Sequence, residues 1–292
     1  MGLNSGLQLI NHKKHIGGNL KSITAIFIAA FLLNTSAFAQ YKLEYKASGS
    51  APLRYDANTT LQTVESMMGQ EAKVSVKSYQ HITMTSTKAG AELLYNITVD
   101  SSRNVAILPN GDTTTTSSPS VGQIKQTTVR PDGEEISSKW LDTTFAKTQA
   151  GQTKDFGSFF FRLPAKEVTT GSTWTQEKVD TVATGGGEGS IFVSTVSNYK
   201  LIDKQTVEGI PCVKITFTGT VGLKGATTYQ GIEFAIKGTG KISGTAFFDY
   251  TNGKVVRIKG SSEQDLTMAS SGQQKMTIPM TQRTDYDLLL LK

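Results

Sequence analysis

The side chains that carry most enzyme chemistry are scarce in this chain of 292 residues. Beyond residue 39 it contains one histidine, His81, and one cysteine, Cys212. A single cysteine forms no intrachain disulfide, and a zinc site of the usual His/Cys kind lacks ligands. A nucleophile activated by histidine would have to use His81. We therefore expect no metal site, no cofactor and no catalytic residue of these kinds.

The surroundings of both residues favour structural roles. His81 lies on the polar face of an expected strand with Lys73, Lys77 and Tyr79. A catalytic histidine is usually held by a carboxylate or carbonyl group, so these neighbours favour an exposed histidine and leave catalysis as the minority alternative. Cys212 alternates with polar residues, which indicates a small buried hydrophobe in preference to a reactive thiol.

Acidic residues leave one enzymatic alternative open, because glycoside hydrolysis requires only two carboxyl groups at a suitable separation. Asp285 and Asp287 would share one face of a strand, Glu134 and Glu135 lie in a hairpin, and Asp249 lies beside another. Aromatic residues that stack on sugars are scarce, since the chain has two tryptophans. We expect these carboxylates to be solvated.

The N-terminus has the features of an export signal. Lys13, Lys14 and Lys21 precede an apolar run at 23–33, and Ala37-Phe38-Ala39 predicts cleavage between Ala39 and Gln40. Removing residues 1–39 takes away three lysines and no acid, which lowers the net charge from +6 to +3 and argues against nucleic acid as a partner. No later segment is apolar enough for a transmembrane helix. We expect an exported protein, periplasmic or extracellular.

The rest of the sequence alternates apolar and polar residues with the period of two that is typical of half-buried strands. Residues 72–84 and 91–99 are clear examples. Asp132-Gly133 and Asn252-Gly253 each stand between two such runs, which predicts two-residue hairpin turns. The pattern predicts a mainly all-β fold.

Matches at an offset of 119 or 120 residues indicate an internal duplication. They pair Tyr55 with Trp174, Tyr79 with Tyr199, Gly90 with Gly209 and Gly133 with Gly253. We expect a single domain over residues 40–292 that consists of two duplicated, curved antiparallel β-sheet units. Unit one covers about 40–140 and unit two about 170–292, with a short helical and aromatic connector at 141–169.

Aromatic residues gather in and beside the connector. A solvated linker would not expose so many large apolar side chains, so we expect this segment to pack against the sheets. The candidate surface for apolar packing or for a ligand comprises Trp140, Phe156, Phe159, Phe160 and Trp174.

Residues Phe161–Trp174 resemble a motif with a Leu-Pro pair, a turn glycine and a tryptophan. Residues 208–215 and the hairpin at 244–260 are similar to the second half of the same family. That family comprises exported bacterial β-rich proteins and is classed as a domain of unknown function. The resemblance implies a structural role for the motif and no catalytic residues.

These observations rank three functions. The first is an envelope protein that binds an apolar small molecule or a protein partner, without catalysis, on a curved β-sheet surface. The second is a structural or surface-interaction module that works through strand edges and Thr-rich loops. The third is a hydrolase that uses acidic residues.

Overall fold

The computed structural model describes residues 39–67, 69–148, 159–183, 189–229, 232–270 and 276–292. The chain divides into two units, residues 1–39 and 40–292. All described strands and the described helix belong to the second unit. The expected signal segment before Ala39 lies outside the described residues, as does Phe156. No helix in the described ranges is both long and apolar enough to cross a membrane.

Twelve strands and one short helix make up the described part of the second unit. The helix, α2, spans Thr143–Thr148 within the predicted connector, and the Asp142 side chain accepts hydrogen bonds from the backbone N–H groups of Thr144 and Phe145 at its start. The strands are β1 (Gly49–Met67), β2 (Gln70–Ala89), β3 (Glu92–Ile107), β4 (Thr113–Thr116), β5 (Ile124–Val129), β6 (Glu135–Trp140), β7 (Thr173–Ala183), β8 (Gly189–Val207), β9 (Ile210–Tyr229), β10 (Ile232–Asp249), β11 (Lys254–Ser270) and β12 (Thr277–Leu290).

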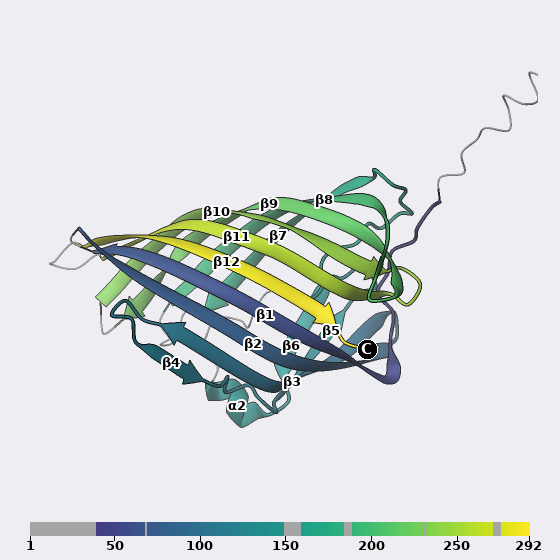
Figure 1. The fold of residues 1–292 in the computed structure, drawn as a ribbon, viewed down its shortest axis with the longest axis horizontal. Coiled ribbons are helices and arrows are strands. Elements are labelled where there is room, and N and C mark those ends of the chain that lie inside the picture. Colours follow the sequence, from purple (N-terminus) through teal and green to yellow (C-terminus); the bar gives the residue numbers. More distant parts are fainter. Residues whose placement is uncertain (1–38, 68, 149–158, 184–188, 230–231, 271–275) are drawn as a thin grey trace, which may run out of the picture. The chain divides into compact units, whose positions relative to one another are not determined.

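The strands form one antiparallel sheet with the order β6-β5-β3-β2-β1-β12-β11-β10-β9-β8-β7, and β4 pairs with β3 (Figure 1). The all-β prediction is therefore confirmed. Each half is a meander, and the two halves join where β1 pairs with β12 over Tyr55–Glu65. The first and last strands of the described domain thus lie at its centre, while β6 and β7 form its edges.

The register separates the sheet into two faces, because residues paired across antiparallel strands point to the same side. Buried Tyr55 on β1 is paired with Ile82 on β2 and with Leu290 on β12, which are also buried. We call this side the inner face and the opposite side the outer face. On β8 to β12, inner positions are mostly buried or half-buried and outer positions mostly exposed.

The sheet curls around a plug made of residues 40–48 and 159–168. Tyr95 on β3 contacts Phe160, and Tyr199 on β8 stacks on Phe161, although six strands separate β3 from β8. Backbone hydrogen bonds between Tyr41 and Val168 join the two parts of the plug. Inner-face residues of distant strands therefore meet the same small cluster, so the inner face is concave.

Both predicted hairpins are present, but neither has a two-residue turn. Arg130 bonds to Glu134 around a three-residue loop, and Asp249 pairs with Lys254 around a four-residue loop. A type I′ turn needs positive φ at both central residues. Gly133 and Gly253 have φ values of 85° and 65°, whereas Glu208 is the non-glycine residue with positive φ in the described ranges. The longer loops let both turns reach the plug, which accounts for the difference.

The predicted duplication is not settled by this topology. With Tyr55 and Trp174 equivalent, strands β1, β2 and β3 correspond in order to β7, β8 and β9. The match of Tyr79 with Tyr199 does not fit, because Tyr79 is 46% exposed on the outer face while Tyr199 is buried on the inner face. That tyrosine pair gives the duplication no support.

Candidate functional site

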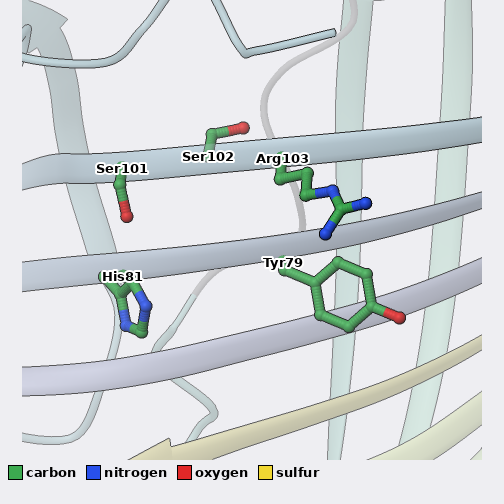
Figure 2. Close-up of a pocket in the computed structure, with 5 residues that line it drawn as sticks. All are labelled: Tyr79, His81, Ser101, Ser102 and Arg103. Atoms are coloured by element: carbon green, nitrogen blue, oxygen red, sulfur yellow. The ribbon is translucent and has the colours of Figure 1, made fainter. Parts of the chain in front are cut away.

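An open hollow of about 340 Å³ lies on β2 and β3 (Figure 2). Its lining comprises Tyr79, His81, Ser101, Ser102 and Arg103. His81 and Tyr79 project from the outer face of β2, and Ser101 and Arg103 are their partners on β3. A β-bulge next to His81 shifts the register here, which brings Ser101 beside the histidine.

The outer face gives His81 a carboxylate that the sequence pattern did not reveal. Asp56 on β1 is the cross-strand partner of His81, and its Oδ1 lies 2.5 Å from His81 Nδ1. Asp56, His81 and Ser101 therefore form a row across three adjacent strands. The prediction of an exposed histidine is confirmed, since 63% of its side chain is accessible.

This row has the residue types of a serine hydrolase but not the geometry. A serine nucleophile needs a hydrogen bond from its hydroxyl to the second histidine nitrogen, and donors aimed at the developing oxyanion. Within the described ranges no hydrogen bond joins His81 to Ser101, and both side chains are exposed to water. The arrangement is that of a solvated hydrogen-bonded pair on a sheet surface.

The carboxylates of the hydrolase hypothesis are engaged with cations. Asp285 and Asp287 share the outer face as predicted, and Arg283 contacts Asp285 while Arg257 and Lys259 contact Asp287. Partial burial pushes the pKa of Asp287 upward, but hydrogen bonding and charge from Arg257, assisted by Lys259, outweigh it and lower the pKa. Asp287 is therefore a stable anion, unlike the general acid that glycoside hydrolysis requires.

The remaining acidic candidates stabilise turns. Glu134 pairs with Arg162 of the plug and with Arg130, and the hydrogen bond from Arg162 is the largest cause of its lowered pKa. The prediction that Asp249 is solvated is wrong: it is almost fully buried, because hydrogen bonds from the backbone N–H groups of Thr251 and Asn252 and from the Asn252 amide replace water at its carboxylate. Both therefore fix the hairpins whose loops touch the plug. Glu135 pairs with Val129 beside the bulge between β5 and β6.

Three of the predicted aromatic residues meet in the plug region. Phe160 is buried between Tyr45 and Tyr95, and Phe159 packs against the same core. Trp174 stacks on Tyr199 with ring centroids 5.4 Å apart, and its indole N–H donates to the Arg162 carbonyl. These side chains fill space between strands, as core residues do.

Trp140 lies apart from that cluster. It ends the edge strand β6, where its ring meets Phe145 of α2 edge-on, and Lys125 Nζ lies 5.7 Å from its centroid. The sequence neighbourhood suggested one surface, but Trp140 and Trp174 stand on opposite edges of the sheet.

Cys212 is buried against the core, and burial raises the pKa of its thiol to about 11. A thiol with such a pKa is protonated near neutral pH, and the prediction that Cys212 is buried is confirmed. Across the described ranges, no group of three or more His, Cys, Asp or Glu residues is placed to hold a metal ion.

Along β8 to β12 the inner face continues beyond the plug as a half-buried, uncharged surface, and Glu65 of β1 stands on the inner face near its far end. Between the plug and the far ends of β9 to β12, the charged side chains all stand on the outer face, among them Lys224, Lys237, Asp265 and Arg283. The inner positions carry small polar, glycine and aliphatic residues. Their aliphatic members include Leu61, Val76, Val193, Leu223, Ile242, Leu266 and Met280.

Alternation in the sequence predicted which residues of each strand share a face. It did not predict that seven strands would bring their aliphatic side chains onto one concave surface. In the described ranges, the charged side chains of the inner face in β7 and β8 up to Leu201 are Lys178 and Asp180, which form an ion pair at the edge, 2.8 Å apart. The concave surface is therefore suited to an uncharged, partly apolar occupant.

Comparisons with known proteins leave the family open. The sequence matches no protein family and no curated protein. Among solved structures it is similar to Pseudomonas aeruginosa OccK2 (OpdF), at 8% identity and a TM-score of 0.25, over 84% of this chain and 100% of that chain. The same protein in complex with glucuronate gives 7% identity and a TM-score of 0.28, over 85% and 100%. Similarity of this size supports no conclusion about this chain.

Proposed function

We propose that this is an exported protein of the bacterial cell envelope that binds an apolar or amphiphilic small molecule without catalysis. The ligand would lie along the inner face of β8 to β12, beyond the plug. The observation that carries the proposal is the segregation of charge. Charged side chains occupy the outer face of these strands, whereas the concave inner face is uncharged and half-exposed.

Charge segregation has a clear energetic consequence. Half-exposed Leu223, Ile242 and Leu266 still contact water, and covering such side chains gains roughly 25 cal/mol per Å² of apolar area removed from water. An inner-face charge would oppose that gain, because a desolvated ion without a partner costs several kcal/mol. The interspersed Ser, Thr and Gln side chains can hydrogen-bond to a polar headgroup or to water.

Export to the envelope rests on the sequence. The basic residues, the apolar run and the Ala-x-Ala site occur in the order of a cleaved signal. The scarcity of cysteine fits a protein whose stability does not depend on disulfides. A structural module remains the second candidate, favoured by the edge of β7 with which no described strand pairs. A hydrolase ranks last, because Asp287 and Asp285 are paired with arginines.

The first test is native mass spectrometry of the protein purified from envelopes of the cells that produce it, followed by extraction and identification of any adduct. We expect a stoichiometric lipid or similar amphiphile. A protein that carries no adduct, and that also fails to bind a fluorescent fatty acid such as dansylaminoundecanoic acid, would contradict the proposal.

A matched pair of variants locates the site. Leu223→Glu places a carboxylate on the inner face, and Thr220→Glu places the same charge on the outer face of the same strand. We expect the first to weaken binding of the fluorescent fatty acid by about tenfold or more, since burying a leucine contributes about 1.5–3 kcal/mol. The second should leave binding within a factor of two. Circular dichroism spectra that match the parent protein would confirm that both variants fold.

A further inference from the structure

The edge strand β7 carries features that the binding function does not explain. It pairs with β8 over Thr173–Ala183, and no described strand pairs with its other side. Val179 at its middle has 72% of its surface exposed on the outer face. A long unpaired edge with an exposed apolar residue is a template for pairing with another strand.

Two more exposed apolar side chains surround Val179. Phe192 and Val196 of β8 are 54% and 36% exposed, and both point to the outer face. Val179 is paired with Ser194, which places it between Phe192 and Val196 on the neighbouring strand. The three side chains form one apolar patch at the edge of the sheet. No described strand lies beside β7 to cover the outer side of this patch.

We propose that two copies of this chain associate through β7, which pairs antiparallel with β7 of the second copy about a two-fold axis at Val179. Such an interface is self-complementary, because each copy presents the same strand to the other. The outer faces of both copies lie on one side, so the two Val179 side chains meet and the two apolar patches merge into one.

The charges of β7 favour this register over the two neighbouring ones. With Val179 on the axis, Lys178 faces Asp180 of the second copy, and Asp180 faces Lys178, on the inner side of both sheets. Glu177 faces uncharged Thr181. Moving the axis by one residue to Lys178 or to Asp180 would place two equal charges directly opposite each other, which is destabilising. Within each copy the Lys178–Asp180 pair already shares the inner face of the strand.

The other edge of the sheet is shorter, although it also carries an exposed apolar residue, Ile136. β6 spans six residues, Glu135–Trp140, and four of them are exposed polar or apolar side chains without an alternating pattern. Its last residue, Trp140, packs against Phe145 of α2. A short edge with an adjacent helix is a poor template for strand addition. The structure therefore favours pairing at β7 alone.

Sedimentation velocity over about 1–100 µM tests the proposal with the protein purified as its cells export it. We expect a concentration-dependent dimer. Val179→Lys puts two ammonium groups on the axis and should weaken dimerisation at least tenfold. Thr239→Lys on the outer face of β10, which has strands on both sides, is the matched control and should leave it unchanged. A monomer at every concentration would overturn the proposal.

Charge reversal tests the register itself. Lys178→Asp and Asp180→Lys should each abolish the dimer, because each variant places equal charges opposite each other at two positions. Mixing the two variants should restore association, since each Asp of one then faces a Lys of the other. Association of either variant alone, or no association in the mixture while the parent protein dimerises, would contradict this register.

A covalent readout checks the axis. Val179→Cys should form a disulfide-linked dimer on mild oxidation, whereas Thr175→Cys should not, because it would face Ala183. The native Cys212 is buried and does not compete. Dimerisation and ligand binding should be independent, because Val179 faces the outer side and Leu223 the inner side. The Val179→Lys variant should still bind the fluorescent fatty acid, and the Leu223→Glu variant should still form the dimer.

Discussion

Asp287 illustrates how single residues act in this protein. Arg257 donates from Nε and from one terminal nitrogen to the two carboxylate oxygens of Asp287, at 3.0 Å and 2.7 Å, and Lys259 lies 3.3 Å away. The pair joins β11 to β12 near the core, and both side chains are more than two-thirds buried. A bidentate, half-desolvated pair contributes more than an exposed one.

Replacing Asp287 with Asn should lower the free energy of unfolding by about 1 kcal/mol at neutral pH. Because the folded protein lowers the pKa of Asp287 below its ordinary value of 3.8, the stabilisation is present above that value and is lost as the pH falls through the lower folded value. Urea denaturation at several pH values should therefore show a gap between parent and variant at pH 7 that narrows below about pH 4.

Asp265→Asn supplies the control for that experiment. Asp265 stands on the same outer face, on β11, and is exposed. It should change the denaturation midpoint little at any pH. A gap for Asp287→Asn that widens in acid would mean that the ion pair does not stabilise the folded state.

The sequence predicted the exposure of His81 but not its partner. Alternation along β2 correctly placed His81 on an exposed face, because that information is local to one strand. Asp56 lies 25 residues away on β1, and its position opposite His81 depends on the pairing register. Register follows from which whole faces become buried together, so no local pattern revealed the partner.

Glycines on the inner face help strands β9 to β12 to bend around the plug. Gly244 on β10 is paired directly with Gly260 on β11, and the Phe217 and Tyr286 rings lie where their side chains would be. Aromatic side chains that cover glycines are a known device of curved sheets. The alternating pattern predicted strands here, but strong curvature at these positions follows from contacts between strands.

Gly244→Ala should therefore destabilise the protein by about 1–3 kcal/mol, because the added methyl group would overlap the Lys259 carbonyl oxygen and the Phe217 ring. Thermal unfolding followed by circular dichroism measures the effect. Gly222→Ala is the control, since its methyl group would meet only the Ser194 hydroxyl, at 2.7 Å, and points to the outer face. It should be neutral or slightly stabilising, because alanine reduces the entropy of the unfolded chain.

If Gly244→Ala destabilised the protein no more than Gly222→Ala, the inner face would tolerate a side chain at position 244.

The connector at 141–169 was only partly predictable from the sequence. Its aromatic content indicated packing, and Phe160 is indeed buried. Its division into α2 on one edge and an irregular plug segment inside the curve could not be predicted from composition, because both arrangements bury aromatic rings.

The plug contacts both meanders, which also meet along the β1–β12 seam and through the hydrogen bond from the Tyr55 hydroxyl on β1 to the Val255 carbonyl on β11. Tyr45 lies at its centre, in edge-to-face contact with Phe160 and Phe248, and its hydroxyl accepts a hydrogen bond from the Phe161 N–H at 3.1 Å. Burial raises the pKa of Tyr45 well above its ordinary value, which keeps the hydroxyl protonated. The Tyr45 backbone N–H also donates to the Pro131 carbonyl between β5 and β6, so contacts from Tyr45 reach both halves of the sheet and loosening it should loosen both.

The two tryptophans can test this coupling, since Trp140 reports on β6 in the first half and Trp174 on β7 in the second. In single-tryptophan proteins made by Trp140→Phe or Trp174→Phe, fluorescence in urea should give coincident transitions. Tyr45→Phe removes the hydroxyl that accepts a hydrogen bond from the Phe161 backbone N–H. The free energy of unfolding obtained from each tryptophan should fall by the same amount, about 1–3 kcal/mol. Tyr79→Phe on the exposed outer face should shift neither. Two separate transitions would mean that each meander folds on its own. A shift in only one of them would mean that the plug stabilises only that half, so the concave surface would depend on that half alone.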